Sequence, residues 1–127
     1  MLKQVIDVIE LLDDAAASGD KAAALLKQRC GLTLETKRIR GPKGSTDFVR
    51  TLIPGTKGKA AGGNAPTLGI IGRLGGIGAR PERIGIVSDA DGAVTALACA
   101  LKLGEMAGKG DRLPGDVIVA THICPNA

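Results

Sequence analysis

The sequence contains almost no aromatic residues. Among 127 residues there is no Trp, no Tyr and one Phe, Phe48, although 44% of the chain is hydrophobic. Proteins that bind single-stranded nucleic acid stack bases on aromatic side chains, and no helix-turn-helix or zinc-finger spacing is present, so we expect no nucleic-acid partner. Ala, Val, Ile and Leu must fill the core instead, which requires close packing of small residues.

Other absences narrow the class of protein further. The three cysteines, Cys30, Cys99 and Cys124, are odd in number and lack CxxC spacing, which argues against a disulfide framework and a structural zinc site. No apolar run approaches the roughly 18 residues of a membrane span, and the chain begins with an amphipathic helix rather than a signal peptide. We therefore expect a cytoplasmic protein with reduced thiols and no membrane contact, forming one domain over residues 1–127.

Positive charge is concentrated in the middle of the chain. Between residues 37 and 83 there are ten basic residues and two acidic ones. Such a segment can form a solvated face or attract a small anionic ligand. The glycine-rich run "GTKGKAAGGNAP" lies within it, but Ala60 stands where a phosphate-binding P-loop needs Ser or Thr, so a surface loop is the simpler interpretation.

The N-terminal half predicts a helical pair followed by a strand pair. Residues 2–12 carry an apolar stripe at helical spacing, made of Leu2, Val5, Ile6, Ile9 and Leu12. A second helix is expected between Ser18, as its N-terminal cap, and Gly31, as its left-handed end, so that the two helices form a hairpin. Residues 32–40 begin with alternating apolar and polar residues, and residues 46–53 are rich in β-branched residues, so both are expected to be strands. The turn sequence "GPKGS" between them favours an antiparallel pair.

The C-terminal half predicts a strand-helix-strand unit. After a short helix expected between Pro66 and Gly75, residues 83–89 read as an apolar strand, 91–110 as an alanine-rich helix and 114–122 as a second strand. The two strands of such a crossover are parallel, so their carboxyl ends open on the same edge of the sheet. The expected fold is α/β: a mixed sheet with this parallel unit at its C-terminal end and flanking helices.

Polar residues gather at the two expected strand tips. Asp89 and Asp91 follow the first strand together with Ser88, and His122 ends the second strand between Thr121 and Cys124. Asp91 alone is better explained as a helix cap. The whole set indicates a functional site, because ligands bind at this edge in open α/β folds.

The run "GSTDFVRTLIPGTKGKAAGGNAPTLGIIGRLGGIGARPERIGIVSDADGAVTALACALKLGEMAGKGDRLPGDVIVATHICPNA" resembles an uncharacterised microbial family catalogued as domain of unknown function 1177. The resemblance implies no established activity. Members of that family look longer than this chain, so the resemblance implies the N-terminal part of a longer protein. A C-terminal segment, or a second chain cut from the same precursor, would then complete the fold.

The segment "SDADGAVTALACALKLGEMAGKGDRLPGDVIVATH" is more distantly similar to co-catalytic zinc aminopeptidases. In those enzymes a metal-bridging aspartate at a strand tip precedes a helix, and Asp89 occupies the matching position. This chain differs from those enzymes in two features. Residues 86–88 contain no equivalent of their His-x-Asp on the preceding strand, and residues 122–125 stand where they have paired glutamates.

These patterns predict a metal-dependent hydrolase of the amidase or peptidase kind. Asp89, Asp91 and His122 are expected to bind zinc or manganese and to act in catalysis, since a metal compensates two neighbouring carboxylates and lowers the pKa of its bound water. The substrate is expected to be a small, anionic or peptide-like amide. The basic residues expected to hold its carboxylate are Lys57, Lys59, Arg73 and Arg80.

Two other classes of function stay open. A self-processing amidase or acyltransferase would use a new N-terminal residue as its nucleophile. A non-enzymatic module would bind an anionic metabolite with its basic loop, while Asp89 and Asp91 only cap a helix. Cys124 as a thiol nucleophile beside His122 is a weaker alternative, because the two share a face only if the strand persists that far. A homo-oligomer is expected in each case.

Overall fold

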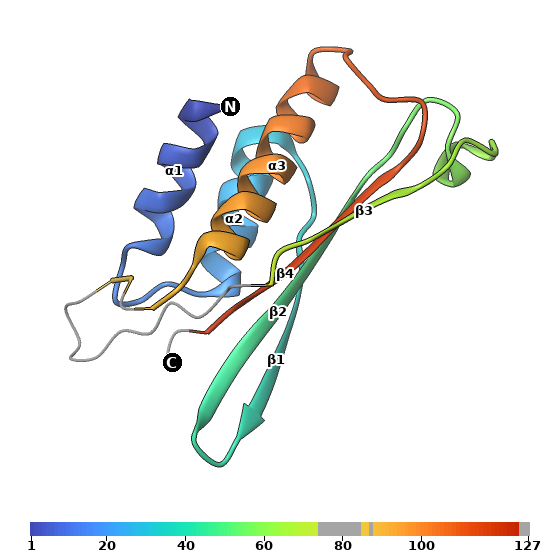
Figure 1. Ribbon diagram of the computed structural model, residues 1–127. Helices are drawn as coiled ribbons and strands as arrows, with labels where there is room; N and C mark the ends of the chain where they lie inside the picture. The colour runs from blue at the N-terminus through green and yellow to red at the C-terminus, as the bar shows by residue number, and fades with distance from the viewer. Residues whose placement is uncertain (74–84, 87, 125–127) are drawn as a thin grey trace.

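The computed structural model describes residues 1–73, 85–86 and 88–124 (Figure 1). Among these residues, three α-helices lie on one face of a four-stranded mixed sheet (Figure 1). The elements in chain order are α1 (Leu2–Leu12), α2 (Gly19–Cys30), β1 (Glu35–Gly41), β2 (Gly44–Ile53), the short 3-10 helix η1 (Lys59–Ala61), β3 (Leu68–Ile71), α3 (Asp91–Gly108) and β4 (Val117–Ile123). The α/β class with a mixed sheet is therefore confirmed.

The second helix begins and ends at the residues expected from the sequence. The Ser18 hydroxyl accepts a hydrogen bond from the Lys21 backbone N–H at 3.2 Å, and Gly31 ends the helix with φ of 72°. Only glycine adopts that left-handed conformation without strain. Both α1 and α2 pack along α3, which forms the centre of the helical layer.

The buried face of α1 differs from the expected stripe. Leu2, Ile6 and Ile9 are exposed, whereas Val8 and Leu12 are buried. The apolar arc of α1 is wider than the strip that packs on α3, and this strip includes the polar Gln4, so periodicity alone could not select it. The expected apolar stripe therefore remains largely on the surface.

The sheet has the strand order β1-β2-β4-β3. The β1–β2 hairpin is antiparallel as expected, β2 pairs antiparallel with β4, and β3 pairs parallel with β4. The chain thus contains a parallel strand-helix-strand unit, formed by β3, α3 and β4.

The first strand of this unit was assigned wrongly from the sequence. The parallel partner of β4 is Leu68–Ile71, where a helix was expected, while the described residues of the 83–89 segment lie outside strands. A four-residue apolar run between Pro66 and Gly72 has no diagnostic periodicity, so only pairing decides its structure. That pairing is extended by the Leu68 N–H, which donates to the Asp116 carbonyl at 2.9 Å, and by the Gly72 N–H, which donates to the Ala120 carbonyl at 2.9 Å.

The core lies between the helices and one face of the sheet. Alternate residues of β2 and β4 are buried, and Val49, Val119 and Ile123 are among them. The sheet side of α3 consists largely of alanines, including Ala93 and Ala96 with no exposed surface. Small side chains let the helix approach the sheet closely, which compensates for the shortage of aromatic residues.

No helix among the described residues has both the length and the hydropathy required to cross a lipid bilayer.

Candidate functional site

The carboxyl end of β3 meets the first turn of α3 at a close backbone contact. A Cβ on Gly72 would lie 2.1 Å from the Gly92 carbonyl oxygen, so only glycine fits at this crossing. The Thr121 hydroxyl of β4 is buried and donates to the Gly72 carbonyl at 2.8 Å. These contacts fix the tip of β3 against the start of α3.

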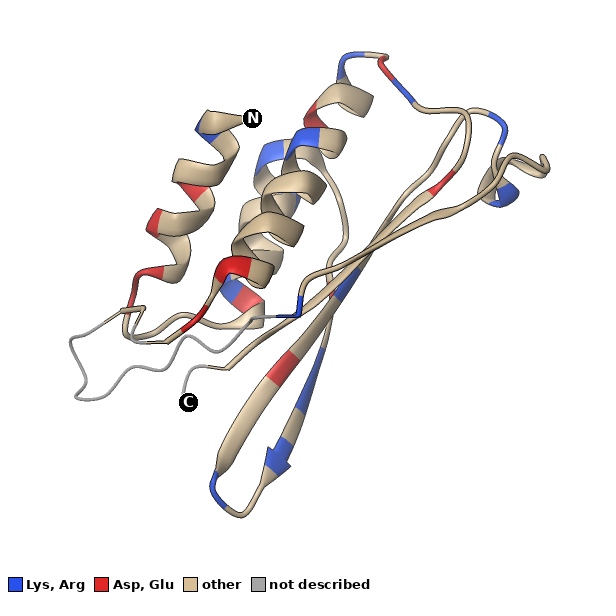
Figure 2. Ribbon diagram, viewed as in Figure 1, with Lys and Arg blue, Asp and Glu red and all other residues tan. Residues whose placement is uncertain are grey.

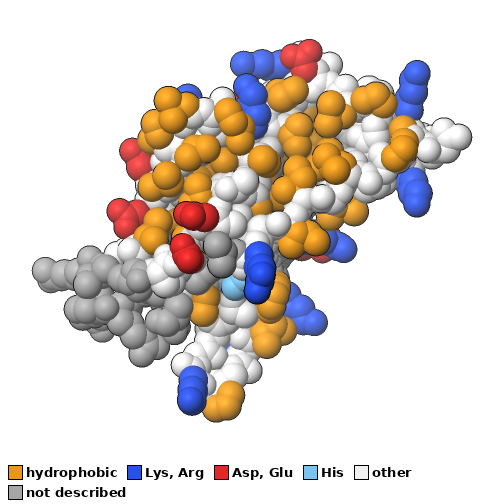
Figure 3. Space-filling model, in the orientation of Figure 1, with side chains coloured by type: hydrophobic (Ala, Val, Ile, Leu, Met, Phe, Trp, Pro, Cys, Tyr) orange, Lys and Arg blue, Asp and Glu red, His pale blue; other side chains and the backbone are white. Residues whose placement is uncertain are grey.

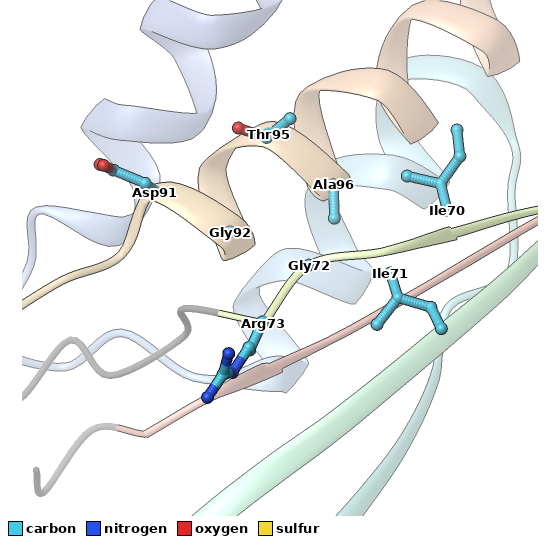
Figure 4. A pocket seen from close by; sticks show the side chains of 8 residues that line it. All are labelled: Ile70, Ile71, Gly72, Arg73, Asp91, Gly92, Thr95 and Ala96. Carbon is cyan, nitrogen blue, oxygen red and sulfur yellow. The ribbon is translucent and has the colours of Figure 1, made fainter.

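A hollow of about 350 Å³ lies beside this contact (Figure 4). The residues that line it are Ile70, Ile71, Gly72, Arg73, Asp91, Gly92, Thr95 and Ala96. Arg73 extends from the end of β3 and Asp91 from the start of α3, on opposite sides of the glycine contact, and their side chains point away from one another (Figure 4). One cation and one carboxylate therefore flank a largely apolar surface.

A second hollow of about 400 Å³ adjoins the start of α3 on its other side. Ile9, Ile86 and Ser88 line it together with Asp89, Ala90 and Asp91. Both carboxylate residues are exposed, and Asp91 lines both hollows. Asp89 and Asp91 therefore line one hollow at the start of α3.

Asp91 is not the cap of α3. Ala90 occupies the cap position without a side-chain hydrogen bond, and Asp91 is the first helical residue. A carboxylate in the first turn is stabilised by the positive end of the helix dipole. The helix dipole therefore accounts for a carboxylate at this position without a bound ligand. The oxygens of Asp91 remain accessible.

His122 is engaged elsewhere. Its Nε2 lies 2.9 Å from the Arg73 carbonyl oxygen and its Nδ1 lies 3.3 Å from the Thr46 hydroxyl, while its ring packs beside Phe48 at 5.8 Å between centroids. A carbonyl oxygen can only accept, so Nε2 carries a proton in this arrangement. His122 therefore holds the backbone just after β3 against β4.

The expected ligand set is not assembled by the described residues. Within residues 1–73, 85–86 and 88–124, no three His, Cys, Asp or Glu side chains are placed to hold one metal ion. His122 is thus not grouped with Asp89 and Asp91. The Cys124 thiol donates to the Ser45 carbonyl at 3.5 Å.

The expected substrate-binding residues are divided between the two ends of the sheet. Arg73 lies at the carboxyl end of β3, but Lys57 and Lys59 lie in the loop near the start of β4 (Figure 1). The seven residues of β4 span about 20 Å, so the lysines are far from Arg73. Arg80 lies outside the described residues.

Asp116 explains the position of this lysine-containing loop. It is almost fully buried, and its carboxylate accepts from the Gly55 N–H at 2.8 Å and the Ala60 N–H at 3.0 Å. These hydrogen bonds hold the pKa of Asp116 below its usual value. The loop is therefore an ordered part of the fold, fixed by the aspartate that precedes β4.

Sequence reasoning missed two contributors to the site. Gly72 and Thr95 line the hollow, but Gly72 was assigned to a helix and Thr95 has no distinguishing pattern. The succession of an apolar run, a glycine and an arginine could have indicated a strand tip.

The family comparison covers most of the chain. A family model described as "Protein of unknown function (DUF1177)" matches residues 37–127, which include β2, β3, β4 and α3. No curated protein matches the chain.

Proposed function

The chain belongs to the DUF1177 family, whose function is unknown, and we propose that it binds a small zwitterionic ligand, an amino acid or short peptide, at the tip of β3. The observation that supports this proposal is that Arg73 and Asp91 both line the apolar hollow, on opposite sides of the contact between Gly72 and Gly92. Its volume of about 350 Å³ suits a ligand at the small end of the usual range.

Charge favours a zwitterion over a simple anion. The Arg73 guanidinium can hold a carboxylate through two parallel hydrogen bonds. Asp91, with Asp89 close to it in sequence, presents negative charge at the same edge and would repel an anion while attracting an ammonium group. A ligand with both charges satisfies both sides.

The floor of the hollow supplies the apolar part of the recognition. Ile70 and Ala96 line it on the helix side of β3, and Ile71, which is 82% exposed, borders it from the other side of the strand (Figure 4). Burying part of that surface against an aliphatic ligand side chain contributes about 25 cal/mol for each Å² removed from water. We therefore expect aliphatic amino acids and dipeptides to bind better than glycine.

Calorimetric titration tests this function directly. The ligands are free aliphatic amino acids and dipeptides, compared with their N-acetylated and C-amidated forms. The substitutions Arg73→Ala and Asp91→Asn should each weaken binding at least about tenfold, equivalent to about 1.4 kcal/mol. Lys57→Ala, at the other end of the sheet, should leave affinity unchanged. Equal binding of the acetylated and free forms would contradict the role of Asp91.

A metal-dependent hydrolase is the second candidate. The observation that favours it is that Asp89 and Asp91 line the same hollow and offer exposed carboxylate oxygens, which suit zinc or manganese. A catalytic zinc site uses about three protein ligands, so at least one more must come from outside the described residues. The expected substrate is a peptide-like amide held by Arg73.

Elemental analysis of the purified protein tests the hydrolase candidate. Bound zinc or manganese that is lost in Asp89→Asn and retained in Cys99→Ala would support it. Hydrolysis of amide substrates that persists without metal would contradict it.

A further inference from the structure

The face of the sheet opposite the helices carries exposed apolar side chains. We call it the outer face and define it by Ile39, Phe48, Leu52, Ile118 and Ala120, which share one side of β1, β2 and β4. Phe48 is 49% exposed and Leu52 is 43% exposed. All three helices lie on the other side of the sheet (Figure 1). An antiparallel sheet can leave one face in water, but a group of large exposed apolar side chains on that face is typical of an interaction surface.

The outer face is also hollowed. A depression of about 310 Å³ is lined by Lys37, Phe48, Arg50 and Ala120 among others. Ala120 lies beside Arg50 in the strand register, and its small side chain leaves room between larger neighbours. The depression can receive an aliphatic side chain from a partner.

The surroundings of the outer face are basic. The segment from β1 to β2 carries five Lys or Arg residues and two acidic residues, and Figure 2 shows the positive charge along this hairpin. Lys37 and Arg50 border the depression, and Arg50 forms an exposed ion pair with Glu35 at 3.0 Å. A complementary partner would present apolar side chains flanked by acidic ones.

Helix α1 of this same chain has that pattern. Leu2, Ile6 and Ile9 are 74%, 46% and 40% exposed and follow one another at helical spacing. Residues 1–14 contain four acidic residues against Lys3 (Figure 2). Asp7 pairs with Arg29 at 2.8 Å and Asp14 with Lys21 at 2.9 Å, so Glu10 is the acidic residue of α1 without an ion pair among the described residues. Figure 3 shows hydrophobic side chains gathered over α1 on the face in view.

We propose that the outer face binds helix α1 of a second copy of this chain. The Leu2, Ile6 and Ile9 stripe lies on Phe48, Leu52 and Ile118, and Glu10 of α1 faces the basic hairpin. The two contacting surfaces are different parts of the chain, so the association is head-to-tail and leaves one free surface of each kind at its ends. This proposal is independent of ligand binding at the tip of β3.

Paired blocking variants test this geometry. Ile6→Lys places a positive charge on α1 that the basic hairpin repels, and Phe48→Glu places a negative charge on the outer face that α1 repels. Both side chains are about half exposed, so both variants should fold. Leu113→Glu changes an exposed leucine away from both surfaces and serves as the matched control.

Analytical ultracentrifugation then gives a distinctive pattern. The wild type and Leu113→Glu should increase in mass with concentration, and each blocking variant alone should remain monomeric. An equal mixture of the two blocking variants should form a one-to-one dimer, because one supplies an intact outer face and the other an intact α1. Circular dichroism checks that each variant is folded, and Ile9→Lys or Leu52→Glu replaces a variant that is not.

Four outcomes would overturn the proposal. A monomeric wild type at about 100 µM excludes an association of the strength typical of specific contacts. A mixture of folded blocking variants that stays monomeric indicates that identical surfaces meet in the wild-type contact. A blocking variant that associates by itself shows that the contact lies elsewhere. If the chain is monomeric and its outer face binds a different acidic helix, the outer face serves another partner.

Discussion

Asp47 provides the sharpest test of how the helical layer is joined to the sheet. It lies on β2 with none of its surface exposed, and its carboxylate accepts from Arg38 Nε at 2.7 Å, Arg38 Nη2 at 3.0 Å and the Gly19 N–H at 2.8 Å. One side chain therefore connects β1, β2 and the start of α2. We predict that Asp47→Ala destabilises the protein strongly.

The expected magnitude follows from these contacts. A hydrogen bond to a charged group contributes about 1.5–3 kcal/mol, and a buried N–H left without an acceptor costs about 1–3 kcal/mol. The Arg38 side chain is 42% exposed and can turn toward water, which reduces its share. We therefore expect the free energy of unfolding to fall by about 2–4 kcal/mol, a large part of the total for a domain of this size.

Acidification gives a second readout of the same contact. The hydrogen bonds from Arg38 lower the pKa of Asp47 below its usual value of 3.8, against the opposing effect of burial and with help from the Gly19 N–H. A carboxylate whose pKa is lower in the folded state than in the unfolded state stabilises the fold. This stabilisation is complete above the unfolded-state pKa and is lost as the pH falls through the folded-state pKa. The stability difference between wild type and Asp47→Asn should thus be constant above about pH 5 and shrink below about pH 4.

Urea denaturation followed by circular dichroism measures both effects. Glu35→Ala is the matched control, because it removes an exposed ion pair with Arg50 and should cost less than about 1 kcal/mol. A loss in Asp47→Ala no larger than in Glu35→Ala, or a pH-independent difference in Asp47→Asn, would refute the reasoning.

Three further substitutions test local features by the same denaturation assay. Gly31→Ala should lower the free energy of unfolding by about 1 kcal/mol or more, since alanine is strained at φ of 72°; an unchanged value would show that the helix can end differently. Ser18→Ala should lower the free energy of unfolding by about 1 kcal/mol because it removes the α2 cap. An unchanged value would show that the Asp47 contact alone holds the start of the helix. Thr121→Val should cost about 1 kcal/mol and also weaken ligand binding, because it releases the Gly72 carbonyl; unchanged affinity would separate that bond from the site.

The regular elements were largely predictable because their signals are local. The Ser18 cap, the left-handed Gly31, the alanine-rich α3 and the β1–β2 hairpin depend on residues that are close in sequence. Asp89 and Asp91 lie close together because they are two residues apart at the start of α3. Membership of the family was evident from sequence as well.

Long-range contacts decided the features that the sequence left ambiguous or indicated wrongly. Leu68–Ile71 is a strand because β4 supplies its hydrogen-bond partners, and the face of α1 that is buried depends on where α3 lies. Likewise, His122 binds the Arg73 carbonyl rather than joining the two aspartates, because β4 and the end of β3 run side by side.

The sequence by itself determined which residues form most of the helices and strands. It also determined that the core is built from small aliphatic side chains, because the chain has almost no aromatic residues. Only the tertiary structure decided that Gly72 and Gly92 touch, that Arg73 and Asp91 flank one hollow, and that the lysine loop lies at the opposite end of the sheet. The physical reason is range: capping and periodicity act within a few residues, whereas a site is assembled by strand pairing and packing between segments distant in the chain.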